Sequence, residues 1–298
     1  MNITNFNMKT RHQTKGLTRN TTDKYYTKDT VVELCLQDVK KHLKINKDDL
    51  IIEPSAGNGS FIPGIKKLSN NFEFYDLEPE NKEIIKQDYL LYSTKKEYEK
   101  IHVIGNPPFG RQSSLAIKFV KKSCEFCDSV SFILPKSFKK DSLQRKFPLN
   151  FHLIFQKDLP TNSFLVNNEE HDVPCVFQIW EKKTTDRKRN EKLEPVNFMF
   201  VNKTENPDIS FRRVGVNAGT IETEIQEKNI QSHYFIKFTN GHSIADNIRK
   251  LSSIKYDFNN TVGPKSISKQ ELIAKFNPLL DELDELVELV ELVELVKV

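Results

Sequence analysis

The stretch LIIEPSAGNGSF, residues 50–61, joins an apolar run to a loop that contains glycines. Residues 50–52 are apolar, Glu53 ends the run, and Gly57 and Gly59 follow in the loop. A short apolar run that ends in this way is typical of a buried strand in a parallel sheet. Ligands of open α/β sheets bind outside the carboxyl ends of the strands, where glycine lets a ligand approach the backbone. The stretch therefore predicts a buried strand followed by a binding loop.

Similar short runs recur on the carboxyl side of this stretch and alternate with helical or loop segments. The predicted strands after residue 53 are 72–76, 83–88, 102–105, 129–134, 151–155 and 173–180. Apolar residues share one helical face in the segments 28–43 and 113–126. This alternation predicts an α/β fold with a mostly parallel sheet that is covered on both faces. A polar loop joins the last two runs, so a hairpin is expected to place an antiparallel strand at the sheet edge.

The rest of the chain divides by composition. Residues 1–24 are polar and predict a flexible basic arm, which precedes the α/β domain at 25–182. The charged segment KKTTDRKRNEKLE then predicts a linker into a smaller α+β region at 183–278. Residues 279–298 are acidic and of low complexity, which favours a solvated, partly helical tail; a helix that binds a partner is the alternative.

Composition limits the class of protein. The chain has 298 residues with 37% hydrophobic and 29% charged residues, and its net charge is +4. A basic body permits a polyanionic partner without requiring one. No apolar run approaches the about 18–20 residues of a membrane span, and the N-terminus lacks the apolar segment of a secretory signal. The four cysteines do not suggest a disulfide scaffold. We therefore expect an intracellular site of action, cytoplasmic or nuclear, with no membrane partner.

Three predicted strand ends carry acidic side chains that suit one kind of ligand. The carboxylate of Glu53 suits a cationic group, and an acid here argues against a pyrophosphate cofactor. Asp76, in YDLEP, is placed to accept two hydrogen bonds from a ribose diol. In QDYL, Asp88 can accept a hydrogen bond from an exocyclic amine, and Tyr89 offers a flat face. An amino-acid cation, a ribose and an adenine together make S-adenosylmethionine, which is the predicted cofactor.

A fourth strand end carries two consecutive prolines, in KIHVIGNPPFGRQSS at 100–114. Neither proline has a backbone N–H, and each fixes its own φ. The side-chain carbonyl of Asn106 and the backbone carbonyl of Pro107, held by Pro108, can accept hydrogen bonds from an adenine amine and favour its pyramidal, nucleophilic form. Phe109 can stack on the base. These four residues are the predicted catalytic set, and a base that reaches them must be single-stranded or flipped out.

These motifs resemble those of the N6-adenine branch of the S-adenosylmethionine-dependent methyltransferases. The shared order over residues 23–182 is DKYYT, EPSAGNG, YDLEP, QDYL and NPPF. The resemblance implies a Rossmann-like class I fold with a seven-stranded sheet. It also implies that the methionine end lies against Thr27 and the loop from Glu53 to Gly59, that Asp76 binds the ribose and that Asp88 binds the adenine amine. The predicted cofactor set is Thr27, Glu53, Ala56, Gly57, Gly59, Asp76, Asp88, Tyr89 and Asn106. The Phe of NPPF and the Gly that follows it also resemble RNA adenine methyltransferases.

Further residues are candidates for nucleic-acid contacts. In related enzymes an aromatic residue of the loop before the last strand contacts the target base, so Phe164 can form a ring sandwich with Phe109 or pack inward. The segment LPKSFKKDSLQRKF, which includes Lys139 and Arg145, suits a surface that follows phosphates or a solvated helix face. Arg212 and Arg213 beside Phe211 suit phosphate and base contacts, so the smaller region is expected to recognise the substrate. A scaffold that only completes the core is the alternative.

Several alternatives stay open at this point. The fold also suits a non-catalytic protein that binds nucleic acid or a partner, and the planar amide of a protein glutamine poses the same chemical problem as adenine. The sequence does not decide between DNA and RNA or give an oligomeric state. Cys124 and Cys127 form a single CxxC pair without a second pair, and the seven histidines show no ligand spacing. We therefore predict structural cysteines and no metal.

Overall fold

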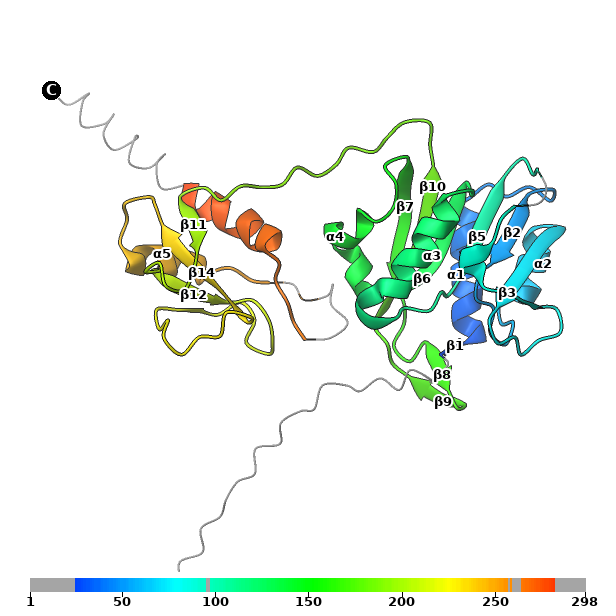
Figure 1. Ribbon diagram of the computed structural model, residues 1–298, viewed down its shortest axis with the longest axis horizontal. Helices are drawn as coiled ribbons and strands as arrows, with labels where there is room; N and C mark the ends of the chain where they lie inside the picture. The colour runs from blue at the N-terminus through cyan, green and yellow to red at the C-terminus, as the bar shows by residue number, and fades with distance from the viewer. Residues whose placement is uncertain (1–24, 95–96, 257, 259–263, 282–298) are drawn as a thin grey trace, which may run out of the picture.

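The protein is described by a computed structural model, which covers residues 25–94, 97–256, 258 and 264–281 (Figure 1). The predicted basic arm and residues 282–298 of the predicted tail lie outside the described residues. The central feature is a seven-stranded sheet in the order β4-β3-β2-β5-β6-β10-β7. Its strands are β2 (Leu50–Glu53), β3 (Asn71–Asp76), β4 (Ile85–Lys86), β5 (Ile101–Gly105), β6 (Ser129–Pro135), β7 (Phe151–Asp158) and β10 (Cys175–Lys182).

The strand directions define the fold class. The pairs from β4 to β6 are all parallel, whereas β10 is antiparallel to both β6 and β7. The predicted hairpin is formed by β7 and β10, and β7 is the edge strand. The antiparallel strand is β10, so it lies one position inside the edge and not at the edge itself. Numbered within the sheet, the order is 3-2-1-4-5-7-6, which is the topology of a Rossmann-like class I methyltransferase fold. The predicted fold class is confirmed.

Alternating side chains bury both faces of the sheet. Ile51 packs in the core on one face, together with Ile104 and Ile133, while Leu50 and Ile52 pack in the core on the other. Helices cover the two faces, and the short 3-10 turns lie in the connections. They are α1 (Asp29–His42), α2 (Ile62–Leu68), α3 (Ser114–Cys124), α4 (Asp141–Gln144), η1 (Tyr89–Leu91), η2 (Arg111–Ser113) and η3 (Lys136–Lys139).

A small three-stranded sheet joins a hairpin, β8 with β9, to a strand that is far from it in the sequence, β1. The strands are β1 (Tyr26–Thr27), β8 (Phe164–Val166) and β9 (Glu169–His171), and β1 pairs antiparallel with β8. Thr27 lies opposite Phe164, and the Lys28 amide donates to the Ser163 carbonyl at 3.1 Å. The pairing therefore fixes Tyr26 and Thr27 beside the loop that precedes the last strand.

The carboxyl-terminal region has its own sheet and core. Four antiparallel strands run in the order β11-β14-β12-β13, and Phe198, Phe211 and Phe276 pack together beneath them. Phe276 comes from helical residues 269–281, which Figure 1 draws in orange. The elements are β11 (Phe198–Val201), β12 (Ile209–Arg212), β13 (Ile221–Glu222), β14 (His233–Phe238) and α5 (Ile244–Leu251). This separate core is consistent with a second region of the protein. We propose that the second region begins after Lys182, where β10 ends.

The segment predicted as a charged linker is held at both ends. The Lys183 amide donates to the Asn150 carbonyl at 2.7 Å, next to β7. Farther along, the Leu193 amide donates to Gln270 at 2.8 Å and the Val196 amide to Asn277 at 3.0 Å. Backbone hydrogen bonds to ordered partners remove conformational freedom. These contacts hold both ends of the predicted linker, residues 183–196, which we call the strap.

A buried polar group lies at the amino ends of the central strands. His102, on β5, is 2% exposed, and its Nδ1 lies 2.7 Å from Ser129 Oγ. Its Nε2 lies 3.3 Å from Asp49 Oδ2. Burial lowers the pKa of His102, although hydrogen bonding and attraction to Asp49 oppose this effect. The folded protein therefore holds a neutral imidazole over part of the pH range in which the unfolded chain is protonated.

No helix among the described residues is long and apolar enough to span a membrane.

The burial of His102 predicts a pH dependence of stability. The folded pKa of His102 lies below the unfolded value, so the unfolded state binds more protons as the pH falls through about 6.5 and the free energy of unfolding decreases. The slope from this group is at most about 1.4 kcal/mol per pH unit. Chemical unfolding between pH 5.5 and 7.5 measures it, with the His102→Gln variant as the comparison. An identical slope in the variant would contradict the prediction.

Candidate active site

The carboxyl ends of β2 and β3 are tied together by one carboxylate. Asp76 ends β3, and its Oδ2 accepts a hydrogen bond from the Gly57 amide at 2.8 Å. Its Oδ1 accepts from the Glu78 amide at 2.8 Å. Gly57 has φ of 52° and Gly59 has φ of 88°, in the left-handed region that glycine tolerates best. The loop after β2 therefore turns back over the end of β3, as the sequence predicts for a binding loop.

Glu53, the last residue of β2, is a buried acid, and the described part of the chain places no cation in an ion pair with it. It is 2% exposed, and its Oε2 has no hydrogen-bond partner among the described residues. Burial raises the pKa of Glu53 well above its usual range, and the nearby Asp76 carboxylate adds to the shift. A buried carboxylate that lacks partners is costly in the empty protein. This cost is removed when a cation or a hydrogen-bond donor binds.

Asn106, at the end of the adjacent strand β5, presents a second unsatisfied acceptor. Its Oδ1 is buried and has no partner in the described part of the chain. Its Nδ2 donates to Thr27 Oγ1 at 3.2 Å, and its backbone carbonyl accepts from Ser55 Oγ at 2.9 Å. These contacts hold the amide so that its nitrogen is occupied and its oxygen is not. The strands β2 and β5 pair directly, so the two unsatisfied oxygens follow neighbouring strand ends.

Two further residues shape this site and were not among the predicted site residues. Tyr26 lies over the glycine loop, because a Cβ on Gly57 would meet its ring at 3.5 Å, and its hydroxyl donates to Glu80 at 2.6 Å. Ser55 holds the Asn106 carbonyl, as described above. Both belong to quoted motifs, DKYYT and EPSAGNG, but only the β1–β8 pairing and the strand order show what they contact.

Asp88 and Tyr89 have different positions, although they are neighbours in the sequence. Asp88 is half-buried and caps η1, with its Oδ1 accepting from the Leu90 amide at 2.9 Å. Tyr89 is 1% exposed, stacks on Phe119 at 5.5 Å and pairs its hydroxyl with Ser123 at 2.9 Å. The ring of Tyr89 is thus part of the core beneath α3. The prediction that it offers a face to a ligand is wrong, because its apolar ring and its hydroxyl are both satisfied inside the core.

The aromatic residues proposed to sandwich a base do not form a pair. Phe164 is 1% exposed and makes an edge contact with Tyr25, with ring centroids 6.5 Å apart. Its packing in the core is the inward alternative, and the sandwich with Phe109 is not observed. Phe109 is half-buried, and its carbonyl accepts from the Leu115 amide at 3.1 Å, at the start of α3. Pro107 is buried and Pro108 is exposed, so the proline corner lies at the surface of the site.

The basic segment after β6 is largely neutralised by its own surroundings. Lys136 and Lys139 both pair with Asp158, at 3.0 and 3.1 Å, and Lys140 lies 3.5 Å from Glu271. Its aromatic residues, Phe138 and Phe147, are 0% and 2% exposed. This arrangement corrects the predicted phosphate-tracking surface of alternating cations and rings. Arg145 of this segment differs from the lysines because it lines a pocket together with Arg187 and Arg189.

Arg212 and Arg213 point to different surroundings. The Arg212 Nε donates to the Val214 carbonyl at 2.8 Å and so closes a local turn. Arg213 lies over the ring of Tyr234 at 5.4 Å and lines a hollow of about 350 Å³ together with Lys269 and Phe200. Only Arg213 of the predicted pair therefore faces a concave surface.

The cysteines and histidines do not form a cluster suited to a metal among the described residues. Cys124 and Cys127 are buried free thiols, and burial raises the pKa of both. A buried thiol with a raised pKa is a poor nucleophile and a poor ligand. Their surroundings in the core are those of structural cysteines.

Comparison with known proteins finds similarity among solved structures alone. No family model and no curated protein matches the sequence. A candidate RNA methyltransferase from Pyrococcus horikoshii aligns with 14% identity over 54% of this chain and 87% of its own, at a TM-score of 0.43. The 23S rRNA methyltransferase ErmE aligns with 12% identity over 54% and 71%, at 0.42. An rRNA methylase from Streptococcus thermophilus aligns with 15% identity over 50% and 93%, at 0.34. At these TM-scores, cofactor and substrate have to be argued from the residues of this chain.

The buried carboxylate of Glu53 predicts a second pH effect on stability. Its folded pKa is raised, so its contribution to stability is present below the unfolded value of about 4.3 and is lost as the pH rises. The Glu53→Gln variant cannot ionise. We expect it to unfold like the wild type near pH 4 and to be more stable at pH 8, by about 1.4 kcal/mol for each pKa unit of the shift. Chemical unfolding across this range is the measurement, and a difference that does not change with pH would contradict the prediction.

Proposed function

We propose that this protein is an enzyme that transfers a methyl group from S-adenosylmethionine to the N6 amine of adenine in a nucleic acid. The observation that carries the proposal is the pair of buried, unsatisfied oxygens at adjacent strand ends, Glu53 Oε2 and Asn106 Oδ1. One suits the cationic end of the cofactor and the other suits the hydrogens of an amine. Few buried polar groups in proteins lack a partner, so two at one edge of the sheet support a binding site there.

The residues present fit S-adenosylmethionine. In this proposal the buried carboxylate of Glu53 would hold the ammonium group, a positive partner that the described residues do not supply. Asp76 accepts the ribose hydroxyls with the lone pairs that its two amide contacts leave, and Asp88 accepts the adenine amine. When bound, the cofactor supplies an electrophilic methyl group on its sulfonium. Gly59 is needed for the packing of the loop itself, since a Cβ there would meet Ile62 at 2.8 Å and Asn81 at 2.9 Å.

The target amine is held by the proline corner. Asn106 Oδ1 and the Pro107 carbonyl accept its two hydrogens, which favours the pyramidal form in which the nitrogen lone pair is available. Asn106 is prepared for this role because Thr27 and Ser55 fix its amide and backbone. Phe109 stacks on the base and sets its plane. Fixed acceptors and positioning together lower the barrier by several kcal/mol, and a proton is lost only after the amine has become cationic.

A protein glutamine is the second candidate substrate. The observation that favours it is the internal pairing of Lys136, Lys139 and Lys140, which removes much of the predicted phosphate surface. Labelled S-adenosylmethionine incubated with separate DNA, RNA and protein pools separates the candidates. Label in N6-methyladenosine after digestion of RNA or DNA supports the proposal. Label in the protein pool alone, or in none, would overturn it.

Asn106→Ala tests the role of the unsatisfied oxygen. We expect methyl transfer to fall by about 10²- to 10³-fold, as for the loss of one preorganised hydrogen-bonding group, while affinity for S-adenosylmethionine changes by no more than a few-fold. Rates from labelled cofactor and affinities from calorimetry measure the two effects. Asn217→Ala, at an exposed position in the smaller region, is the matched control. A variant with wild-type turnover would remove Asn106 from the mechanism.

Asp88→Asn tests the cofactor site without removing the cap of η1. Asparagine caps helices about as well as aspartate, so thermal stability should be unchanged. A charged acceptor makes hydrogen bonds roughly twice as strong as a neutral one, and we expect S-adenosylmethionine to bind about tenfold more weakly. Calorimetric titration measures the change. Unchanged affinity would show that Asp88 does not contact the cofactor.

A further inference from the structure

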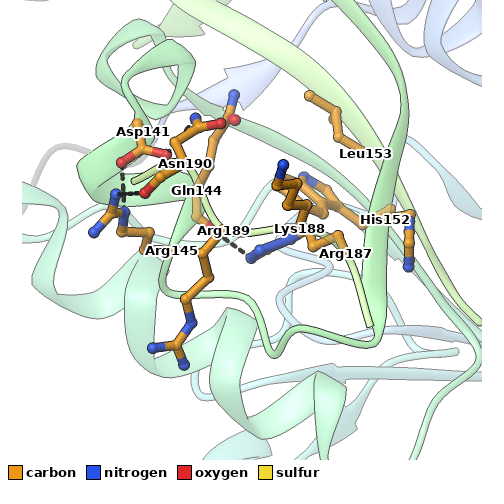
Figure 2. A pocket seen from close by; sticks show the side chains of 10 residues that line it. Asp141, Gln144, Arg145, His152, Leu153, Arg187, Lys188, Arg189 and Asn190 are labelled. Atoms are coloured by element: carbon orange, nitrogen blue, oxygen red, sulfur yellow. Dashed lines mark hydrogen bonds and ion pairs between the residues drawn. The ribbon is translucent and has the colours of Figure 1, made fainter. Parts of the chain in front are cut away.

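A cationic pocket lies where the strap meets the edge of the seven-stranded sheet, away from the residues of the proposed site. Its volume is about 270 Å³. Figure 2 shows Arg145 reaching it from the end of α4, and Arg187, Lys188 and Arg189 reaching it from the strap. We name this site the arginine pocket. Its lining residues are Asp141, Gln144, Arg145, His152, Leu153, Trp180, Arg187, Lys188, Arg189 and Asn190.

Arg187 fixes the strap against the sheet domain. Its Nε donates to the Phe151 carbonyl at 3.0 Å, and its NH2 group donates to the carbonyls of Gln144 at 3.0 Å and Phe147 at 2.9 Å. Its guanidinium lies over the ring of Trp180 at 5.4 Å. The Arg187 amide also donates to the Leu149 carbonyl at 2.8 Å. The backbone at Arg187 is therefore anchored to the sheet domain, and Lys188 and Arg189 follow directly after this anchor.

A second set of contacts closes the pocket on the α4 side. Arg145 Nε pairs with Asp141 at 2.5 Å, and its NH2 group donates to the Asn190 carbonyl at 2.6 Å. The Asn190 amide group donates back to Asp141 at 2.8 Å. One carboxylate thus orders both segments. The contacts bring Arg145 and the strap together although they are more than 40 residues apart in the sequence.

The charges of the pocket are not balanced by its acids. Among the described residues that line it, Asp141 is the one carboxylate, against four side chains that carry a positive charge. The donors of Arg187 are satisfied by neutral carbonyl oxygens, which leave its net charge in place. Burial lowers the pKa of Arg187, and Arg189 and Arg145 add to the effect, while Asp141 and the exposed Asp186 oppose it. Cations that a concave surface holds together raise the local concentration of anions.

Outside the pocket, Lys136 and Lys139 share the carboxylate of Asp158 at the far end of β7, and Lys140 pairs with Glu271. Lys188 and Arg189, in contrast, are exposed. We propose that the arginine pocket binds phosphate groups of the nucleic-acid backbone, and so extends the substrate site. The proposal rests on the proposed function for its substrate. Guanidinium groups suit it because they bind phosphate oxygens through two parallel hydrogen bonds.

The position of the pocket sets a minimum length for such a substrate. His152 and Leu153 lie at the start of β7, while the proposed site lies at the carboxyl ends of the parallel strands, toward which β7 runs. The 8 residues of β7 span roughly 26 Å at about 3.3 Å per residue. At about 3.4 Å per base step of a stacked strand, this span corresponds to about eight nucleotides between the adenine and the pocket. We therefore expect a four-nucleotide substrate to be too short to contact both.

The test uses the full chain and a paired variant, Lys188→Ala with Arg189→Ala. Neither side chain is needed to anchor the strap, which Arg187 does. The matched control is Lys118→Ala with Lys121→Ala, which removes two exposed cations from α3. The probe is an unstructured, fluorescently labelled 20-nucleotide RNA that contains adenine, and the same sequence as DNA. Anisotropy gives the affinity at several salt concentrations.

For the paired variant we expect about tenfold weaker binding of the 20-nucleotide probe. The slope of log K against log salt should become shallower by about 1.4, which corresponds to two lost phosphate contacts on a single strand. Methyl transfer to a four-nucleotide probe should stay at the wild-type rate, and so should S-adenosylmethionine affinity. The control pair should show less than half of the change in slope.

Three results would overturn the proposal: a slope change equal to that of the control pair, an equal loss with the four-nucleotide probe, or a wild-type protein that binds neither nucleic acid. The proposed function fails in a different way. A wild type that binds the long probe through the pocket and transfers no methyl group to adenine would retain the arginine pocket and refute the methyltransferase assignment.

Discussion

The site depends on the cost of burying the carboxylate of Glu53 at the end of the central strand. The strand is enclosed by cores on both faces, so its last side chain leaves water whether or not a partner is present. The described residues give it no hydrogen-bond donor for Oε2, and the neighbouring Asp76 makes ionisation harder. Such a group persists when function requires it, because a neutral or smaller side chain would suit the empty fold better.

The polar residues around Glu53 are fixed by hydrogen bonds that do not use all of their acceptor atoms. Asp76 is occupied by two backbone amides, which fix the glycine loop. Asn106 is occupied on its nitrogen and its backbone carbonyl, which fixes the orientation of its side-chain oxygen. The contacts of Gly57 with Asp76, and of Thr27 and Ser55 with Asn106, link segments distant in the sequence, and they leave acceptor capacity on both side chains. The geometry thus prepares acceptors without supplying donors, as a site for a cationic cofactor and an amine requires.

Charge is distributed differently in the segment after β6 and in the strap. Most lysines of the segment after β6 have carboxylate partners, and such exposed or half-exposed pairs add little stability. The strap is different, since Arg187 spends its donors on carbonyl oxygens and brings further cations with it. The structure therefore concentrates uncompensated positive charge in one pocket. The proposal of a phosphate site there adds a substrate contact that is independent of the catalytic residues.

The sequence by itself determined the sheet and the order of its motifs. Runs such as 50–53 and 129–134 are short, apolar and bounded by turn residues, and local preference and burial agree there, so strands β2 and β6 were predicted within a residue of their bounds. The strand-end acids Glu53 and Asp76 were found for the same reason, since a parallel sheet brings successive strand ends to one edge. Helices α1 and α3 followed from the spacing of their apolar residues.

Only the tertiary structure decided which side chains remain available for a ligand. Tyr89 and Phe164 are aromatic residues in motifs that suggested a binding site, yet both rings lie in the core. Burying an aromatic ring is favourable, and a local sequence pattern does not show on which side of a residue the core lies. Tyr26 and Ser55 gained their positions through long-range pairing. The composition of the strap predicts a linker. Only the folded structure shows that Arg187 fixes it to the sheet domain through hydrogen bonds to three carbonyls. A sequence pattern reports polarity and period, whereas partners that are distant along the chain exist only once the chain has folded.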